Sequence, residues 1–198
     1  MLSSSDMQAN EVLFISLLRK TYRHGIENVI SHLQEGGFFS VPASVHHHNN
    51  FEGGLAKHSL DVYEEAMELY HDFTLKLPFL STVLKEESIT ICSLLHDVCK
   101  MDVFCMRDGE PHGTGIPNNP HGTKSLRLLT EWGLSLTDDE QIAIAWHMGR
   151  WTKDAGCEPQ QVEQMYMDAQ RKTPLVSIIR RADSLASRKA IEEQLIDE

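Results

Sequence analysis

The segment that most restricts the fold of this chain is residues 86–100, EESITICSLLHDVCK. Its apolar side chains fall on nearly every side of a predicted helix, and such a helix is buried in a protein interior. Near its end stand His96 and Asp97. A carboxylate buried there is costly unless a bound cation or a salt bridge compensates it. The chain therefore needs a central helix whose polar end is either ion-paired or holds a metal ion.

Helices account for most of the remaining chain. Apolar residues recur at helical spacing on both sides of the central segment. Asn119 is predicted to cap a helix that has Pro120 at its first position, and Thr137 opens a capping box with Glu140. No segment requires a sheet, so the predicted fold class is all-α, a helical bundle. The predicted helices cover residues 6–20, 26–34, 55–72, a stretch from 120, 137–147, 158–170 and a last helix opened by Thr173 and Pro174.

Residues 101–120 interrupt this helical pattern. The segment is rich in glycine and proline, and a connection of this length without helical pattern is typical of a functional loop. Asp108 and Gly109 fit the turn of a small hairpin. Because the segment directly follows His96 and Asp97, we expect one long loop or small hairpin near the site that this dipeptide forms.

Length and charge limit the class of protein. The 198 residues are enough for one domain with a core of its own, and 41% hydrophobic with 24% charged residues is ordinary for a folded chain. Lys and Arg number 18 against 29 Asp and Glu, which gives a net charge of -11. A chain this acidic does not wrap a phosphate backbone by bulk charge. Nucleic acid is therefore a disfavoured partner.

The chain shows no signal for export or membrane insertion. No segment approaches the roughly 18 continuous apolar residues of a membrane span, and the start MLSSSDMQAN lacks the pattern of a signal peptide. The four cysteines form no CxxC pair and are expected to be reduced thiols; they are Cys92, Cys99, Cys105 and Cys157. We therefore expect a cytoplasmic protein with no membrane partner.

Histidine is the unusual residue of the composition, with 11 copies. Besides His96 and Asp97, polar residues in four further segments border apolar helical faces; they are His58, His121, His147 and Asp183. One such placement is ordinary, but its repetition in five segments is a pattern. Imidazole and carboxylate together suit Zn, Fe, Mn and similar divalent ions. The pattern predicts one central metal site.

In their order along the chain, these residues resemble the signature of the HD-domain metal-dependent phosphohydrolase superfamily, which is a histidine, a His-Asp dipeptide and a distant aspartate. His58, His96-Asp97 and Asp183 match that signature. The stretches HHHNNFEGGLAKHSLDVYEEA and LLHDVCK are similar to the HD domain of YhaM-type exoribonucleases. They are equally similar to stand-alone HD proteins of bacteria, phages and mobile elements.

The resemblance covers about residues 40–190. It implies a single HD domain over residues 1–198, in which the N-terminal helices of residues 6–35 pack on that core. The implied activity is metal-dependent hydrolysis of a phosphomonoester or phosphodiester, with a nucleotide or a related small phosphate ester as substrate.

The resemblance also implies how metal is bound. HD proteins with two more histidines before the last aspartate resemble the members that hold two ions, and His121 and His147 stand at these places. The implied cofactors are two divalent ions, of Mn, Fe, Zn, Ni or Co. In two-metal hydrolysis such ions activate a water for in-line attack on phosphorus. The implied division is one ion on His58, His96 and Asp183, a second on His121 and His147, and Asp97 bridging both.

Further residues are candidates for contact with the substrate. Lys100 matches the HDxxK variant of the motif and is, with Asp97, an implied catalytic residue, because it would contact the phosphate or aid the leaving group. Lys124 and Arg150 each follow a candidate metal histidine by three residues, and each could bind a phosphate or be a solvated surface charge. A histidine pair stands in YhaM-like sequences at the place of the run 46–48, so one of these three is another candidate.

Two neighbouring features have simpler explanations. Arg180 and Arg181 lie beside Asp183, and one of them could pair with a carboxylate elsewhere. Gly53 and Gly54 are expected to allow a tight backbone entry into the helix that carries His58.

Three alternative functions stay open. A 3′–5′ exoribonuclease-like nuclease fits the sequence near His58, but the chain has no strand-rich segment to match the OB-fold of YhaM-type enzymes. A di-iron HD-type oxygenase, similar to inositol oxygenase, uses the same ligand types. A catalytically silent metal-binding module is the non-enzymatic alternative. The absent GYP element and the dipeptide Met148-Gly149 argue against cyclic dinucleotides as substrates.

Overall fold

The computed structural model describes residues 2–152 and 157–196. Within these ranges the regular structure is almost all helical, which confirms the predicted all-α class. No helix in them is long and apolar enough to span a membrane. In chain order the elements are α1 (Ser4–Lys20), α2 (Ile26–Glu35), α3 (Gly54–Lys76), α4 (Leu80–Val83), α5 (Glu86–Leu95), α6 (Lys100–Val103), β1 (Phe104–Arg107), β2 (Glu110–Gly113), α7 (His121–Glu131), α8 (Asp138–Trp146), the 3-10 helix η1 (Gly149–Trp151), α9 (Pro159–Lys172) and α10 (Leu175–Ile196).

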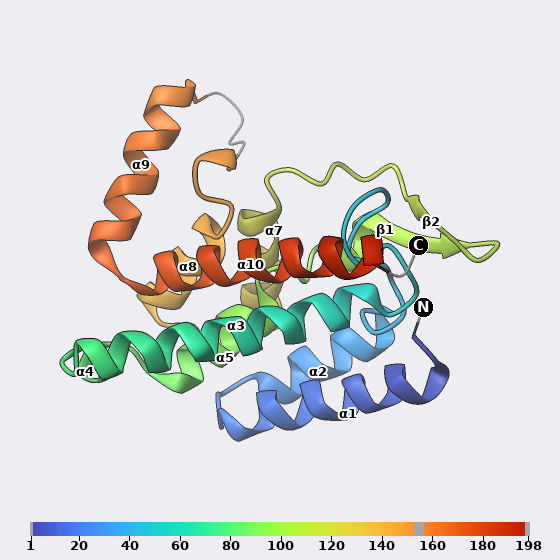
Figure 1. The fold of residues 1–198 in the computed structure, drawn as a ribbon, viewed down its shortest axis with the longest axis horizontal. Helices are drawn as coiled ribbons and strands as arrows, with labels where there is room; N and C mark the ends of the chain where they lie inside the picture. Colours follow the sequence, from blue (N-terminus) through green and yellow to red (C-terminus); the bar gives the residue numbers. More distant parts are fainter. Residues whose placement is uncertain (1, 153–156, 197–198) are drawn as a thin grey trace.

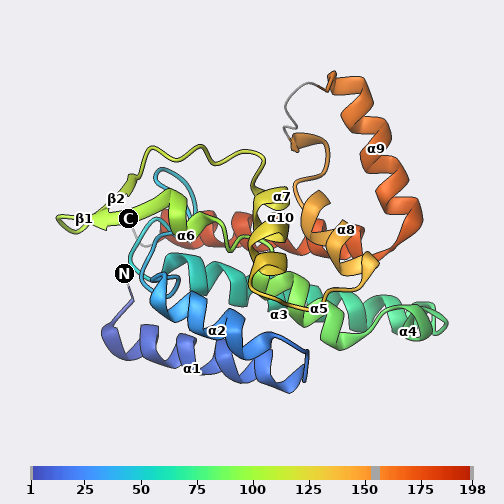
Figure 2. The same cartoon turned by 180° about the vertical axis from the view of Figure 1, so that it is seen from behind.

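Helix α5 lies at the centre of the bundle, as its apolar sequence predicts. All of its residues from Ile89 to Leu95 are buried. α3 and α10 run side by side in opposite directions, and α5 packs against both (Figure 1, Figure 2). α8 contacts α5 and α10, and α7 packs on α8. This packing places α3, α5, α8 and α10 around one interior.

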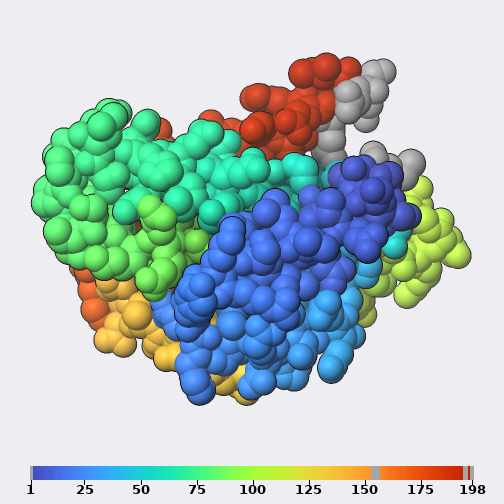
Figure 3. Space-filling view, turned by 90° about the horizontal axis from the view of Figure 1, so that it is seen from below, coloured from blue at the N-terminus to red at the C-terminus, as the bar shows by residue number. Residues whose placement is uncertain are grey.

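Helices α1 and α2 cover one face of the bundle (Figure 3). α1 contacts α2, α3 and α5. Phe14 of α1 packs its ring against those of Phe38 and Phe39, with ring centroids 5.2 and 5.4 Å apart. Phe14 and Leu18 belong to the same hydrophobic cluster as the buried residues of α5. The N-terminal helices thus share their hydrophobic core with the rest of the bundle.

The segment 101–120 forms a small hairpin, one of the two forms expected for it. β1 and β2 are antiparallel, with Arg107 opposite Glu110. Asp108 and Gly109 join them with φ values of 54° and 81°, and two positive values of this kind suit a tight two-residue hairpin turn. The hairpin extends from the side of the bundle (Figure 1, Figure 2), and the chain after it leads back to α7.

The helix predicted over residues 86–100 is shorter in the structure and ends at Leu95. The ring Nδ1 of His96 lies 2.8 Å from the carbonyl oxygen of Ser93. In a continued α-helix that carbonyl would accept from the backbone N–H of Asp97. The chain turns instead through hydrogen bonds that span three residues. The predicted single helix is therefore wrong beyond Leu95, and the His-Asp dipeptide lies in the turn after α5.

The start of α7 also differs from the prediction. Pro120, not Asn119, is the N-cap residue, and its backbone is extended with φ -81° and ψ 106°. The helix therefore begins one residue later, at His121, and the carbonyl of Pro120 accepts from the backbone N–H of Lys124 at 3.1 Å. This shift makes His121 the first residue of its helix.

The capping box predicted at the start of α8 is confirmed, and its glutamate is also part of a buried ion pair. The fully buried carboxylate of Glu140 accepts two hydrogen bonds from Arg23, at 2.6 and 2.8 Å. It also accepts from the hydroxyl of Ser88 at 2.6 Å and from the backbone N–H of Thr137 at 2.8 Å. Glu140 thereby connects the N-terminal segment with α5 and α8.

Arg23→Met is expected to lower the free energy of unfolding by about 3–5 kcal/mol, because it leaves the Glu140 carboxylate buried without its cation. Arg19→Met is the matched control, since the Arg19–Glu27 pair is exposed on both sides and should contribute at most about 1 kcal/mol. Urea unfolding of both variants measures the difference. Equal losses in the two variants would contradict the role given to Arg23.

Candidate metal centre

Six side chains from five segments meet inside the bundle. They fall into three overlapping groups in each of which the candidate ligand atoms all lie within 4.8 Å of one another. The groups are His58, His96 and Asp97; His96, His147 and Asp183; and Asp97, His121 and His147. All except the half-buried Asp183 are buried. The structure thus brings together every residue that the sequence suggests as a metal ligand.

The carboxylate of Asp97 lies between two pairs of imidazoles. Its Oδ2 is 3.2 Å from Nε2 of His96 and 3.8 Å from Nε2 of His58. Its Oδ1 is 3.5 Å from Nε2 of His147 and 3.6 Å from Nε2 of His121. Each oxygen therefore faces its own pair of nitrogen atoms, and every ring presents the same atom, Nε2.

Asp183 approaches the cluster from α10, on the side where His58 and His96 lie. Its Oδ1 lies 3.3 Å from Nε2 of His58 and 4.0 Å from Nε2 of His96. The side chain is 18% exposed, against 2% for Asp97. Asp183 thus lies closer to solvent than the aspartate at the centre.

Two of the imidazoles are fixed by backbone carbonyls at the ends of their helices. Nδ1 of His96 lies 2.8 Å from the carbonyl of Ser93, and Nδ1 of His147 lies 2.7 Å from the carbonyl of Ile144. A carbonyl only accepts, so each Nδ1 must carry the proton. The lone pair is then on Nε2, which points at Asp97. Metal-binding histidines are commonly oriented in this way.

The cluster contains many buried polar atoms without a hydrogen-bond partner. They are Nδ1 and Nε2 of His58, Nε2 of His96, Oδ1 of Asp97, Nδ1 and Nε2 of His121, and Nε2 of His147. Buried polar atoms in folded proteins are nearly always partnered. Nitrogen and carboxylate oxygen atoms that converge without protons between them are the donor set of a divalent metal site. The residues present therefore fit one or more such ions.

The electrostatics of the histidines suit this use. Burial lowers the pKa of His58, and it lowers the pKa of His121 to about 3, so both rings are neutral at physiological pH. Burial also opposes the charged form of His96, but the adjacent Asp97 outweighs it and raises the pKa of that ring. A neutral imidazole has the free lone pair that a metal ion needs.

The two carboxylates are ionised. Burial by itself would raise both values, but Lys100 and His96 hold the pKa of Asp97 well below its usual range. The close contact with His58 and the charge of His96 likewise lower the pKa of Asp183. The two carboxylates therefore face two neutral rings, His58 and His121, and the positive charge beside them comes from His96 and Lys100.

Lys100 supplies part of that charge. Its Nζ lies 2.7 Å from Oδ2 of Asp97, and the residue is buried. Burial opposes the charged ammonium, but Asp97 outweighs it and raises the pKa of Lys100. The spacing of three residues across the turn after α5 is what allows this contact.

Of the histidine run 46–48, it is His48 that approaches the cluster. Its ring lies 4.7 Å from that of His58, and its Nε2 is 3.5 Å from the hydroxyl of Ser187, which is 3.5 Å from Asp183. The sequence suggested one of the three histidines without selecting which. It gave no signal for Ser187, which lies one helical turn after Asp183.

Two glycines at the start of α3 allow the chain that carries His48 to approach the helix of His58. Gly53 has a φ of 77°, and a Cβ at Gly54 would lie 2.0 Å from the backbone oxygen of Asn49. Only a residue without a side chain permits this approach. The expected tight entry into the helix of His58 is therefore confirmed.

The two further phosphate-binding candidates do not join the cluster. The ammonium of Lys124, one turn into α7, is bonded to the carbonyl of Pro117. The exposed Arg150 pairs with Glu163 of α9, with Nε and Oε2 3.5 Å apart. Both side chains already have partners of their own.

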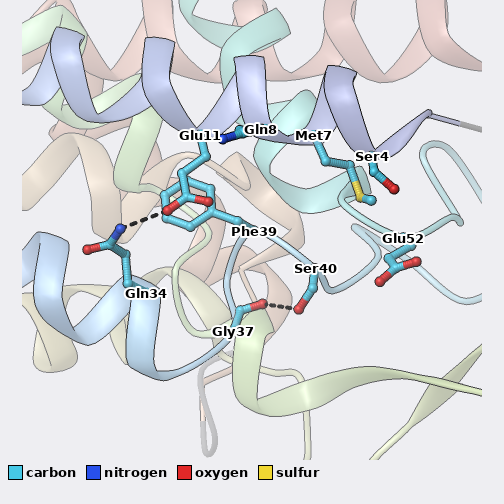
Figure 4. Close-up of a pocket in the computed structure, with 9 residues that line it drawn as sticks. All are labelled: Ser4, Met7, Gln8, Glu11, Gln34, Gly37, Phe39, Ser40 and Glu52. Atoms are coloured by element: carbon cyan, nitrogen blue, oxygen red, sulfur yellow. Dashed lines mark hydrogen bonds between the residues drawn. The ribbon is translucent and has the colours of Figure 1, made fainter.

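A hollow elsewhere on the molecule contains none of these residues (Figure 4). It lies between α1 and the chain after α2, where Gln34 donates to Glu11 at 2.7 Å and Ser40 donates to the carbonyl of Gly37 at 2.9 Å. Its lining carries no histidine, cysteine, lysine or arginine. The hollow therefore has no cationic side chain for a phosphate, and its two carboxylates, Glu11 and Glu52, lie apart from the histidine cluster.

Comparison with known proteins agrees with the geometry. Residues 55–188 match the family model described as the HD domain, a span that includes all six candidate ligands. No curated protein and no solved structure matches the chain significantly, so the likeness to YhaM-type enzymes stays a prediction. Members of the superfamily are generally metal-dependent hydrolases that act on phosphate esters. The chain belongs to the HD domain family.

Proposed function

We propose that the protein is a two-metal phosphohydrolase that cleaves a phosphate ester of a nucleotide or a similar small molecule. The observation that carries this proposal is the position of Asp97, whose two carboxylate oxygens each face a separate pair of imidazole nitrogens. A carboxylate in this position can bridge two ions, whereas a single ion would leave one pair of histidines without use.

The proposed ligands divide accordingly. The side chains that surround Oδ2 of Asp97 would hold the first ion, and Asp183 would complete this group because its Oδ1 is close to the same two rings. The side chains that face Oδ1 of Asp97 would hold the second ion. The first set is His58, His96 and Asp183, the second is His121 and His147, and Asp97 is shared.

The chain's own residues prepare this centre for phosphate. When bound, the two ions activate water and neutralise charge on the phosphoryl oxygens. The carbonyls of Ser93 and Ile144 hold the rings of His96 and His147 in one orientation. Lys100 keeps its ammonium beside Asp97 and is the proposed donor to a phosphoryl or leaving-group oxygen.

The charge of the chain supports a small substrate. The net charge of -11 repels a long polyanion, while a compact phosphate ester meets mainly the local charge of the centre. Substrate contact by Lys124 and Arg150 stays a prediction. A phosphate that binds them would have to replace the carbonyl of Pro117 at Lys124 or the carboxylate of Glu163 at Arg150.

The proposed location is the cytoplasm. All four cysteines are free, and Cys92 and Cys99 are buried. Unpaired thiols are what a reducing compartment maintains.

Asp97→Asn tests the shared ligand. It preserves the shape of the side chain but removes its charge, so the metal content should fall from about two ions per chain to less than one. The rate of hydrolysis of a panel of nucleotides, measured as released phosphate, should fall more than about 100-fold. Even the substitution of a residue that only hydrogen-bonds to a metal ligand lowers activity by about 10–100-fold.

Asp102→Asn is the matched control, because Asp102 is an exposed aspartate only five residues away. It should keep the metal content and activity of the parent protein. Full metal content and activity in Asp97→Asn would overturn the proposed function. So would a parent protein with two iron ions that consumes oxygen and releases no phosphate.

His121→Gln tests the division into two sets. The second ion should be lost because only His147 and Asp97 remain for it, while the first ion keeps its ligands. Mass spectrometry of metals should therefore find about one ion per chain instead of about two. His112→Gln changes an exposed histidine of β2 and should keep both ions. Unchanged content in His121→Gln would contradict the proposed division.

Metal removal should destabilise the fold. The partnerless polar atoms of the cluster gain ligands when ions bind, and free metal at 100 times its dissociation constant adds about 2.7 kcal/mol. For a chain of this size, each kcal/mol shifts the melting temperature by roughly 2–4 °C. Chelated protein should therefore melt several degrees lower and recover when Mn²⁺ is restored. An equal recovery in Asp97→Asn would show that the effect arises elsewhere.

A further inference from the structure

Helix α10 carries a half-buried stripe along the metal centre. Residues three and four apart share a helix face, and Arg180, Asp183 and Ser187 have this spacing. The fully buried face beside the stripe is Ile179, Ala182 and Ala186, and the exposed face is Arg181, Ser184 and Arg188. The hydroxyl of Ser187 lies 3.5 Å from Nε2 of His48 and 3.5 Å from Oδ1 of Asp183. Arg180 is on the other side of Asp183, one turn away.

The side chain of Arg180 contacts Tyr166 of α9 and Gly149 of η1. Its guanidinium carbon lies over the ring of Tyr166 on α9, 5.9 Å from the ring centre, as in a cation–π contact. Its stem passes Gly149, which has a φ of 59° and at which a Cβ would lie 2.5 Å from Nε of Arg180. Gly149 is only two residues after the candidate ligand His147. The half-buried arginine therefore lies between α9, η1 and α10, three residues before Asp183 in α10.

Arg180 has no carboxylate within ion-pair distance among the described residues, unlike Arg150, which pairs with Glu163. Its Nε is buried and has no hydrogen-bond partner there. A buried N–H without an acceptor is costly, and a guanidinium is the side chain best suited to a phosphate. Within residues 2–152 and 157–196 this half-buried guanidinium has no carboxylate partner, and an anionic ligand would supply one.

We propose that Arg180 binds a second, non-reacting phosphoryl group of the substrate, so that the substrates are esters with two linked phosphoryl groups, such as nucleoside diphosphates. This inference rests on the proposed function. The guanidinium is beyond ion-pair distance of Asp97 and Asp183, so it does not lie on the ions themselves. It starts one turn of α10, about 5 Å, from Asp183. On this proposal, a phosphoryl group held at the ions places the next one toward Arg180.

The experiment compares the binding of pyrophosphate and of orthophosphate to the metal-loaded protein by titration calorimetry. Arg180→Gln should weaken pyrophosphate binding by roughly 10–100-fold, the usual effect of losing a charge-assisted contact, and orthophosphate binding by less than about twofold. Arg181→Gln is the matched control. It removes the same charge from the adjacent, exposed residue of the same helix and should bind both anions like the parent protein.

Arg180→Lys distinguishes the loss of a ligand contact from a change in the fold. It keeps a cation over Tyr166 but loses the planar pair of donors, so it should fold normally and still bind pyrophosphate several-fold more weakly than the parent protein. Metal content and melting temperature are measured for each variant. A variant that keeps both values but binds pyrophosphate weakly has lost a ligand contact rather than its fold.

The outcomes separate the two proposals. The role of Arg180 is overturned if Arg180→Gln and Arg180→Lys bind pyrophosphate like Arg181→Gln, if they lose both anions equally, or if the parent protein binds neither anion. The proposed function is tested independently by Asp97→Asn, which should lose both anions together with the ions. Retention of both anions and all metal in that variant would refute the metal centre and leave Arg180 as a simple anion site.

Discussion

The buried charge of Asp97 is the constraint on which the rest of the structure depends. Its carboxylate lies out of water and within 4 Å of four imidazole nitrogens and one ammonium. Lys100 and His96, both with a raised pKa, are the sources of positive charge there, whereas burial keeps the rings of His58 and His121 neutral. A buried carboxylate without enough positive charge around it is unfavourable. Divalent ions add such charge, so the burial of Asp97 and its capacity for metal are a single property.

The ends of two helices make this arrangement compatible with an apolar core. α5 and α8 both end at a histidine whose ring bonds to a carbonyl three residues earlier. Each ring satisfies one of the carbonyls that a helix end leaves free, and its other nitrogen is then directed at Asp97. The same contact therefore ends the helix, fixes the ring and prepares the ligand atom. A central helix can be apolar throughout its length because its polar function is confined to its last turn.

The sequence predicted the features that depend on neighbouring residues. The capping box at Thr137, the turn at Asp108 and the apolar α5 follow from local spacing, and the set of candidate ligands follows from a family resemblance. The end of α5 at Leu95 was not predicted, because it depends on a ring-to-carbonyl contact that helical periodicity does not encode. The position of Arg180 was not predicted either. An arginine's partner depends on how the preceding segments fold back against it, here η1 and α9, and helical periodicity does not encode that packing.

Charge acts at two ranges in this protein, and the two ranges select different ligands. The net charge of -11 is spread over the whole chain and opposes an extended polyanion at distances of about a Debye length. Near the centre the balance differs, because Lys100 lies beside Asp97, Arg180 lies one turn before Asp183 in α10, and bound ions would add positive charge. A ligand small enough to contact only this centre gains from the local charge and largely escapes the repulsion. The same acidic surface that disfavours a nuclease is therefore compatible with tight binding of a small diphosphate.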